Sequence, residues 1–156
     1  MAQDIIGSTA LAIWLYLIAA RGGFWRAAEC DDARLLPEAT VMPTVMQWPP
    51  VSAVVPARDE AETVGETIGS LLRQNYLGTF NVILVDDQSR DATANVARAA
   101  ASALGASERL TVISGRPLPA GWTGKLWAQQ QGVEFACSMP HAPDYLLFTD
   151  ADIVFE

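Results

Sequence analysis

The chain has 156 residues, a formal net charge of −8 at pH 7 and a hydrophobic content of 51%. The length fits one domain, and the apolar content excludes a disordered acidic tail. The negative charge excludes a general nucleic-acid-binding protein, because phosphate binding needs a basic surface. The two cysteines, Cys30 and Cys137, have no spacing typical of a disulfide framework or a zinc site. We therefore expect free thiols in a reducing compartment.

An uncharged apolar run begins near the N-terminus and covers Ile5–Ala20. As a helix this run is shorter than a hydrocarbon core of about 30 Å, and a buried core helix and a signal peptide are the alternatives. A signal peptide would need positive charge before the run, whereas Arg21 and Arg26 follow it. These charges, with Trp25 beside them, favour a membrane anchor over residues 5–25 whose C-terminal side faces the cytoplasm.

The next segment, residues 29–50, contains four prolines and no clean hydrophobic period. Proline disfavours helix at the residue before it and cannot donate to a β-ladder. We therefore expect a linker that lies over the surface of the following domain, residues 51–156.

In this domain, short apolar runs alternate with helical patterns, which predicts an α/β fold with a mostly parallel sheet and flanking helices. The expected strands are Val51–Ala57, Asn81–Val85, Leu110–Ser114 and Tyr145–Thr149. The first helix is expected to start with a capping box formed by Asp59 and Glu62. The second is expected to start at a Ser89 cap and to stop at Gly105. A third is expected from about Lys125 to Ala136.

Four polar segments follow these strands or begin the next helix, where parallel sheets bind their ligands. They are PARDE (Pro56–Glu60), VDDQSRD (Val85–Asp91), GWTGKLWA (Gly121–Ala128) and TDADI (Thr149–Ile153). Each has an ordinary structural interpretation as a helix cap, a solvated turn or a loop with a surface lysine. Their conjunction along one edge of the sheet favours a site for a nucleoside diphosphate.

The chemistry of each segment fits that interpretation. Arg58 suits a phosphate or a nucleobase face, and the adjacent carboxylates of Asp86 and Asp87 need donors such as a nucleobase N–H or ribose hydroxyls. The only lysine of the chain is Lys125, a point charge for phosphate. Asp150 and Asp152 lie two residues apart, so in an extended chain they face one side. Their hard oxygen ligands suit Mg²⁺ or Mn²⁺.

Four short segments, in their order and spacing, resemble glycosyltransferase family 2, whose members have a GT-A (Rossmann-like) fold: PARDE, VDDQSRDAT, GKLWA and TDAD. Longer segments are similar to the hopene-associated subgroup, found beside hopanoid synthesis genes in bacteria: RGGFWR, WPPVSAVVPARDEA and GWTGKLWAQQQG. The resemblance implies transfer of a sugar, with inversion, from a UDP-type donor to an acceptor hydroxyl. The acceptor is expected to be a hopanoid, another lipid or a glycan. The resemblance also places the protein in the bacterial inner membrane, with its soluble domain in the cytoplasm.

The resemblance implies roles for single residues. It assigns the nucleobase and ribose to Asp59 and Asp87 with Asp86 beside them, and it places Lys125 near the nucleotide. Asp152 is expected to ligate a divalent cation, Mg²⁺ or Mn²⁺, with Asp150 supporting the ribose or the metal. The expected nucleotide-binding residues are Pro56, Arg58, Asp59, Glu60, Asp86, Asp87, Lys125 and Asp150, and the expected metal ligands are Asp150 and Asp152.

Family members continue beyond this point with an acceptor-binding half that usually supplies the catalytic base. We therefore expect the chain to be the donor-binding half, truncated after the D-x-D strand, with the base in the missing half. His141 is the only histidine, and its place in a loop predicts a solvated residue. A non-catalytic nucleotide-binding fragment is the alternative function. A dinucleotide-binding oxidoreductase is excluded, because its G-x-G-x-x-G turn is absent after the first strand.

Overall fold

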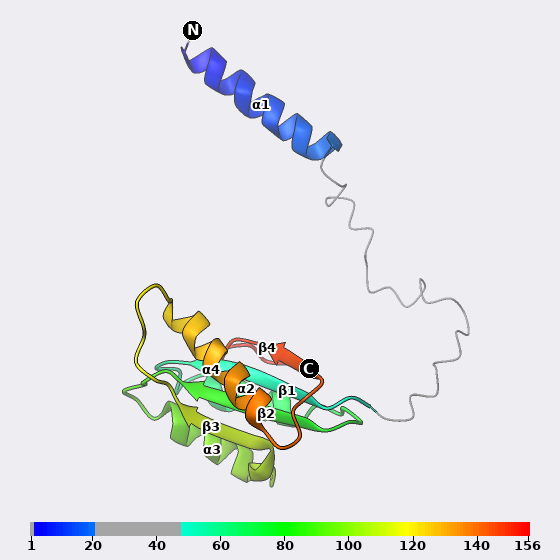
Figure 1. The fold of residues 1–156 in the computed structure, drawn as a ribbon, viewed down its shortest axis with the longest axis vertical. Helices are drawn as coiled ribbons and strands as arrows, with labels where there is room; N and C mark the ends of the chain where they lie inside the picture. Colours follow the sequence, from blue (N-terminus) through cyan, green and yellow to red (C-terminus); the bar gives the residue numbers. More distant parts are fainter. Residues whose placement is uncertain (1, 21–47) are drawn as a thin grey trace, which may run out of the picture. The chain divides into compact units, whose positions relative to one another are not determined.

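The computed structural model describes residues 2–20 and 48–156 and divides the chain into two units, Met1–Val45 and Met46–Glu156. The first unit contains helix α1 (Ala2–Ala20) (Figure 1). This helix exposes large apolar side chains such as Trp14 and Leu15. None of the helices in the described residues is long and apolar enough to cross a bilayer. The membrane anchor over residues 5–25 remains a prediction. Its residues 21–25, and most of the linker predicted over residues 29–50, lie outside the described residues.

The second unit contains a sheet in which all strand pairs are parallel, as the sequence predicts. Its strands are β1 (Val51–Ala57), β2 (Phe80–Asp86), β3 (Leu110–Ser114) and β4 (Tyr145–Phe148). Their order is β3-β2-β1-β4, so the first strand lies inside the sheet and the last at an edge. The register places Val54 opposite Ile83 on one side and Phe148 on the other. The ranges of β1 and β3 match those expected from the sequence. Strand β2 is one residue longer at each end than expected, and β4 ends one residue earlier.

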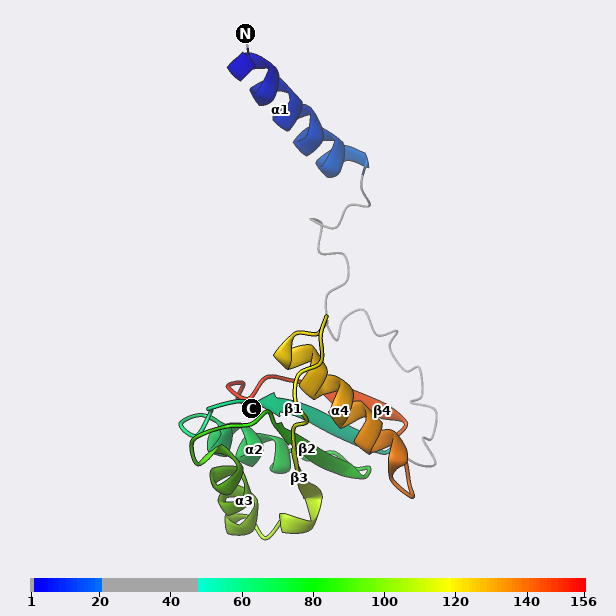
Figure 2. The same ribbon diagram turned by 60° about the vertical axis from the view of Figure 1, so that its left-hand side comes forward.

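Helices cover both faces of the sheet, which gives three layers (Figure 2). Helices α2 (Val64–Leu72) and α3 (Thr93–Ala103) pack on one face, and α4 (Gly124–Ser138) packs on the other. A short 3-10 turn, η3 (Ser107–Arg109), leads from α3 into β3. Neighbouring residues of one strand point to opposite faces, so Val55 joins the core under α2 whereas Val54 joins the core under α4. Both cores are fully closed to solvent at these positions.

The helix boundaries correct two predictions from the sequence. Helix α2 begins at Val64 after Thr63, so the capping box expected from Asp59 and Glu62 does not form. Ser89 does not cap α3, whose first residue is Thr93. The reason is the same for Asp59 and Ser89. Oδ1 of Asp59 accepts from the N–H of Arg90, and Oγ of Ser89 accepts from the N–H of Asp59, so each side chain bonds to the other loop.

Gly105 ends α3 as predicted. Its φ of 64° lies in the left-handed region that glycine adopts readily. The N–H of Gly105 donates to the carbonyl of Ser102 (3.0 Å), and the N–H of Ala106 donates to that of Ala101 (2.9 Å). This pair of bonds is the Schellman motif, which satisfies carbonyls left open by the last turn.

Strand β4 lies at the edge of the sheet and pairs within the described residues only with β1. Its side chains are well exposed, including Tyr145 at 63% and Phe148 at 49%. A flat apolar edge of this kind is a site at which another strand can add.

Gly132 sets the distance between α4 and the sheet. A Cβ built there would lie 2.4 Å from Cγ1 of Val54 and 3.2 Å from Cγ2 of Val85. We expect Gly132→Ala to destabilise the protein, because overpacking of about 1–3 kcal/mol outweighs a gain in helix propensity of about 1 kcal/mol. The measurement is the free energy of unfolding in denaturant.

Gly69→Ala in α2 is the matched control. A Cβ at Gly69 meets only the movable end of the Arg73 side chain, at 3.1 Å. The propensity gain should then dominate, so this variant should be as stable as the wild type or more so. Equal destabilisation of the two variants would show that the approach of α4 to the sheet is not the cause.

Candidate functional site

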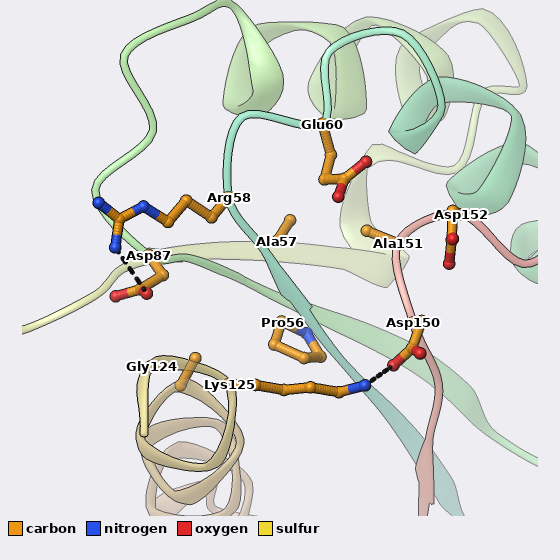
Figure 3. A pocket seen from close by; sticks show the side chains of 11 residues that line it. Pro56, Ala57, Arg58, Glu60, Asp87, Gly124, Lys125, Asp150, Ala151 and Asp152 are labelled. Atoms are coloured by element: carbon orange, nitrogen blue, oxygen red, sulfur yellow. Dashed lines mark ion pairs between the residues drawn. The ribbon is translucent and has the colours of Figure 1, made fainter. Parts of the chain in front are cut away.

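A cavity of about 320 Å³ opens at the carboxyl ends of the strands. All but two of the predicted site residues line it: Pro56, Arg58, Glu60, Asp87, Lys125, Asp150 and Asp152. They come from the ends of β1, β2 and β4 and from the start of α4 (Figure 3). The two exceptions, Asp59 and Asp86, lie in the same loops but outside the lining. The structure thus brings together segments up to about a hundred residues apart, as the topology of a parallel sheet predicts.

Asp87 is the most enclosed carboxylate of the cavity, with 8% of the residue exposed. Its Oδ2 lies 3.7 Å from Nη1 of Arg58, whose side chain reaches across from the β1 loop (Figure 3). Gly115 and Gly124 pack closely around it, since a Cβ on Gly124 would lie 3.1 Å from this same oxygen. Gly124 is the first residue of α4, so the carboxylate lies at the positive end of that helix.

Lys125 and Asp150 form an ion pair across the cavity, with Nζ 2.6 Å from Oδ1 (Figure 3). The side chains are 57% and 48% exposed. An exposed pair of this kind contributes little to stability, about 0–1 kcal/mol. Asp152, two residues along the same loop, makes no hydrogen bond or ion pair with any part of the chain that the structure describes. One predicted metal ligand is thus paired, and the other is open.

The loops after β1 and β2 are held together by reciprocal hydrogen bonds. The N–H of Asp59 donates to Oγ of Ser89 (3.0 Å), and the N–H of Arg90 donates to Oδ1 of Asp59 (2.7 Å). Asp59 and Gln88 both adopt positive φ, at 55° and 58°, which is uncommon for residues other than glycine. The Asp86 carboxylate accepts from the N–H of Ser89 (3.1 Å). Asp59 and Asp86 therefore shape the loops that carry the cavity residues.

Asp91 and Thr93 extend this contact, and no local sequence pattern indicates their role between the loops. Oδ2 of Asp91 accepts from the N–H of Ala61 (3.0 Å), and Oγ1 of the buried Thr93 accepts from the N–H of Glu60 (2.8 Å). The Thr93 hydroxyl in turn donates to Oδ1 of Asp91. This bond is the main reason that the pKa of Asp91 lies below its ordinary value, with backbone N–H groups adding to the effect.

The turn before α4 is fixed from the other side by Arg116, just after β3. Its N–H donates to Oε1 of Gln131 (2.7 Å), and its carbonyl accepts from Nε1 of Trp127 (3.2 Å). The guanidinium lies 4.8 Å from the centre of the Trp127 ring, within the range of a cation–π contact. Since Trp127 and Gln131 belong to α4, these contacts hold the helix that carries Gly124 and Lys125.

The residues of the cavity can hold a divalent cation only if a bound diphosphate supplies further ligands to the same ion. Within residues 2–20 and 48–156, no cluster of three or more His, Cys, Asp or Glu side chains gathers as a metal site. Asp150 and Asp152 offer carboxylates alone. Mg²⁺ and similar ions are usually held by one or two carboxylates together with phosphate oxygens and water. The donor set therefore suits a cation bound together with a diphosphate.

The family model for glycosyl transferase family 2 matches residues 52–156. The chain belongs to this family. The match covers the four strands except Val51, and the whole cavity, and it confirms the prediction from the sequence of a glycosyltransferase by family resemblance. It does not test the hopene-associated subgroup.

Solved structures of glycosyltransferases share the fold. The Pyrobaculum calidifontis mannosyltransferase in complex with GDP-Man and Mn²⁺ has a TM-score of 0.62 at 24% identity, over 96% of this chain and 39% of that one. S. aureus TarS in complex with UDP-GlcNAc has a TM-score of 0.50 at 24% identity, over 66% and 26%. M. tuberculosis glucosyl-3-phosphoglycerate synthase has a TM-score of 0.51 at 23% identity, over 68% and 35%.

These likenesses confirm the α/β fold with a parallel sheet that the GT-A resemblance implies. The chain spans less than two-fifths of the length of each of these structures. A comparison with curated protein sequences finds no significant match.

Asp91 should make the stability of the protein depend on acid pH. Its pKa in the folded chain lies below the ordinary value of 3.8, so on acidification the unfolded chain takes up the proton first. The stabilisation is fully present above that ordinary value and is lost as the pH falls through the lower, folded pKa. Asp91→Asn should therefore flatten the decline of the unfolding midpoint below about pH 4.

Asp144→Asn is the control, because Asp144 is exposed and lies before β4, away from these loops. The measurement is the denaturant midpoint of each variant between neutral pH and about pH 3. If both variants follow the wild-type curve, the contact between the loops does not depend on the Asp91 charge.

Proposed function

We propose that the chain binds a nucleoside-diphosphate sugar together with a divalent cation, as the donor site of a glycosyltransferase. The observation that carries this proposal is the cavity itself. It joins an enclosed carboxylate, Asp87, to the only lysine of the chain and to the two carboxylates of the TDAD segment. Asp87 suits the N–H of a nucleobase or the hydroxyls of a ribose, and Lys125 suits the diphosphate.

The other residues support this assignment in different ways. Arg58 is exposed and free to bond a phosphate or to stack on the base, while its contact with Asp87 keeps it at the cavity. Asp59, which the family resemblance assigns to the nucleotide, already accepts from the N–H of Arg90. Its role in this proposal is to hold the loop that carries Arg58 and Glu60.

The reaction proposed for the whole protein is inverting transfer, in which an acceptor hydroxyl attacks the anomeric carbon and the nucleoside diphosphate leaves. A divalent cation at Asp150 and Asp152 would supply positive charge to the leaving diphosphate. The ammonium of Lys125, which lies beside Asp150, would supply further positive charge to the diphosphate. Transfer also needs a general base for the acceptor proton, and we assign that role to no residue of the cavity.

The acceptor and the location of the protein rest on the sequence. Similarity to the hopene-associated subgroup supports a hopanoid or another lipid acceptor at the bacterial inner membrane. The apolar side chains that α1 exposes support contact with that membrane, with the soluble domain on the cytoplasmic side. A glycan acceptor is the other expectation from the resemblance.

A non-catalytic nucleotide-binding protein is the second candidate. What favours it is that the cavity residues all suit the donor and none is placed to serve an acceptor. The two candidates share donor binding and differ in transfer. Release of UDP or GDP from the sugar nucleotide, measured with lipid extracts or glycans as acceptors, separates them: acceptor-dependent release supports the enzyme, and binding without release supports the second candidate.

Donor binding is tested by calorimetry on the full chain with UDP and with GDP, in the presence and absence of Mn²⁺. Asp152→Ala should abolish the part of the affinity that Mn²⁺ adds, because it removes the open carboxylate of the pair. Asp87→Asn should weaken nucleotide binding by about tenfold or more with or without Mn²⁺, because an amide cannot replace a charged acceptor.

Asp144→Asn is again the matched control. It removes an exposed carboxylate before β4, away from the cavity, and should leave both affinities unchanged. A folded wild-type chain that binds neither nucleotide, with or without Mn²⁺, would refute the donor site. Folding is verified for each protein by its circular dichroism spectrum.

A further inference from the structure

The pairing of Lys125 with Asp150 has a consequence for how a cation and a diphosphate enter the cavity. Lys125 is the second residue of α4, and its side chain extends beneath Pro56 to the loop after β4 (Figure 3). The ammonium thus pairs with Oδ1 of Asp150, an oxygen that could otherwise be a ligand of a cation. Asp152 lies two residues further along that loop and is open.

We propose that Lys125 is a positioning residue that couples metal binding to donor binding. Without a donor, it pairs with Asp150 and opposes a cation at that carboxylate. With a donor, it moves from Asp150 to the diphosphate, and Asp150 becomes a ligand of the cation. This inference rests on the proposed donor site and adds the order of events within it.

Electrostatics dictates the direction of the coupling. A dication placed beside Asp150 would lie next to the ammonium, and like charges at such a distance repel. A diphosphate brings negative charge that attracts both cations and separates them from the shared carboxylate. The cation alone should therefore bind weakly to this cavity, and the cation and the diphosphate should each raise the affinity of the other. By linkage, that factor is the same in both directions.

The exposure of the pair makes the exchange easy. Both side chains are about half exposed, and a pair in water is worth so little that breaking it costs only a few-fold in affinity. Lys125 has a flexible stem and a single charge that is not fixed to one geometry. The Arg58–Asp87 contact, in comparison, involves an enclosed carboxylate that is packed between two glycines. The Arg58 side chain is as exposed as that of Lys125, so the difference lies in the carboxylates: Asp150 is open to water and can exchange its partner for a cation, whereas Asp87 is enclosed.

The first test is calorimetry on the full chain with Mn²⁺ alone, and with UDP at saturating Mn²⁺. Lys125→Met keeps the stem and removes the charge. We expect it to tighten binding of Mn²⁺ alone by roughly two- to fivefold, the value of an exposed ion pair. The same variant should weaken UDP by roughly tenfold, the value of a bond to a charged phosphate. A purely structural role would not move the two affinities in opposite directions.

Two further variants isolate the charge and its place. Lys125→Arg retains a cation at the cavity and should restore the wild-type direction of both affinities. Arg98→Met removes one positive charge from the exposed surface of α3, away from the cavity, and should change neither. If Arg98→Met reproduces the effect of Lys125→Met, net charge is the cause and the exchange is refuted.

The sequence offers a second, direct measurement. Because Lys125 is the only lysine, a protein labelled with isotope at lysine side chains gives one lysine signal in a nuclear magnetic resonance spectrum. We expect that signal to shift when UDP and Mg²⁺ are both present and to shift little with Mg²⁺ alone. In the Asp150→Asn variant, the signal without ligands should already differ from that of the wild type.

The outcomes separate this inference from the function on which it rests. UDP binding that Mn²⁺ strengthens, combined with a Lys125→Met variant whose two affinities fall together or stay unchanged, would refute the exchange and leave the donor site intact. Absence of UDP and GDP binding by the folded wild type would refute the donor site and the exchange with it. Opposite changes, restored by arginine, support both.

Discussion

Strand β1 pairs in parallel with β2 on one side and β4 on the other, and the site depends on this arrangement. Parallel pairing carries the carboxyl ends of all three strands to one edge. The residues after β1, β2 and β4 then meet in a single cavity, although they lie far apart in the sequence. Helix α4 completes the cavity because its first turn begins at that same edge. Because β1 lies between β2 and β4, its loop, with Pro56 and Arg58, lies between Asp87 and Asp150 in the cavity.

Several polar side chains of the loops after β1 and β2 form hydrogen bonds with the neighbouring loop. In the segment after β2, the side chains of Ser89, Asp91 and Thr93 accept hydrogen bonds from backbone N–H groups of the segment after β1. Helix α2 has no side-chain cap, whereas the first N–H of α3, that of Thr93, donates to Oδ1 of Asp91 (2.9 Å). A cap is worth about 1 kcal/mol to a helix. The cap missing from α2 is offset by the bonds that fix the two loops against each other, and Asp91 serves both the contact between the loops and the start of α3.

Much of this architecture could be predicted because strands, glycine stops and strand-end segments are local patterns. The apolar run at Val51–Ala57 coincides with β1, and Gly105 ends α3 where it was expected. The capping predictions failed because Asp59 and Ser89 bond to partners about thirty residues away, and no local pattern contains that distance. The bond between Thr93 and Glu60 could not be predicted for the same reason.

Close packing was equally invisible in the sequence. Gly124 stood out as one of two glycines in a polar segment, but its contact with the Asp87 carboxylate depends on where α4 meets the end of β2. The Lys125–Asp150 pair likewise could not be predicted without the sheet order, because it depends on where the start of α4 lies relative to the end of β4. The motifs identify the chemical groups of the site, and the fold shows which of these groups face one another.

The charges of the cavity explain why these groups require a partner ion. The lining carries four carboxylates, on Glu60, Asp87, Asp150 and Asp152, and two cationic side chains, on Arg58 and Lys125. Each cation is already within ion-pair distance of a carboxylate, so the excess charge is negative. A diphosphate is itself an anion and would be repelled by such a cavity. A divalent cation reverses that balance, since it neutralises the two carboxylates of the TDAD segment and attracts the phosphates. The excess of negative charge in the cavity thus links the two parts of the proposal, because the proposed nucleotide would bind there only together with the proposed cation.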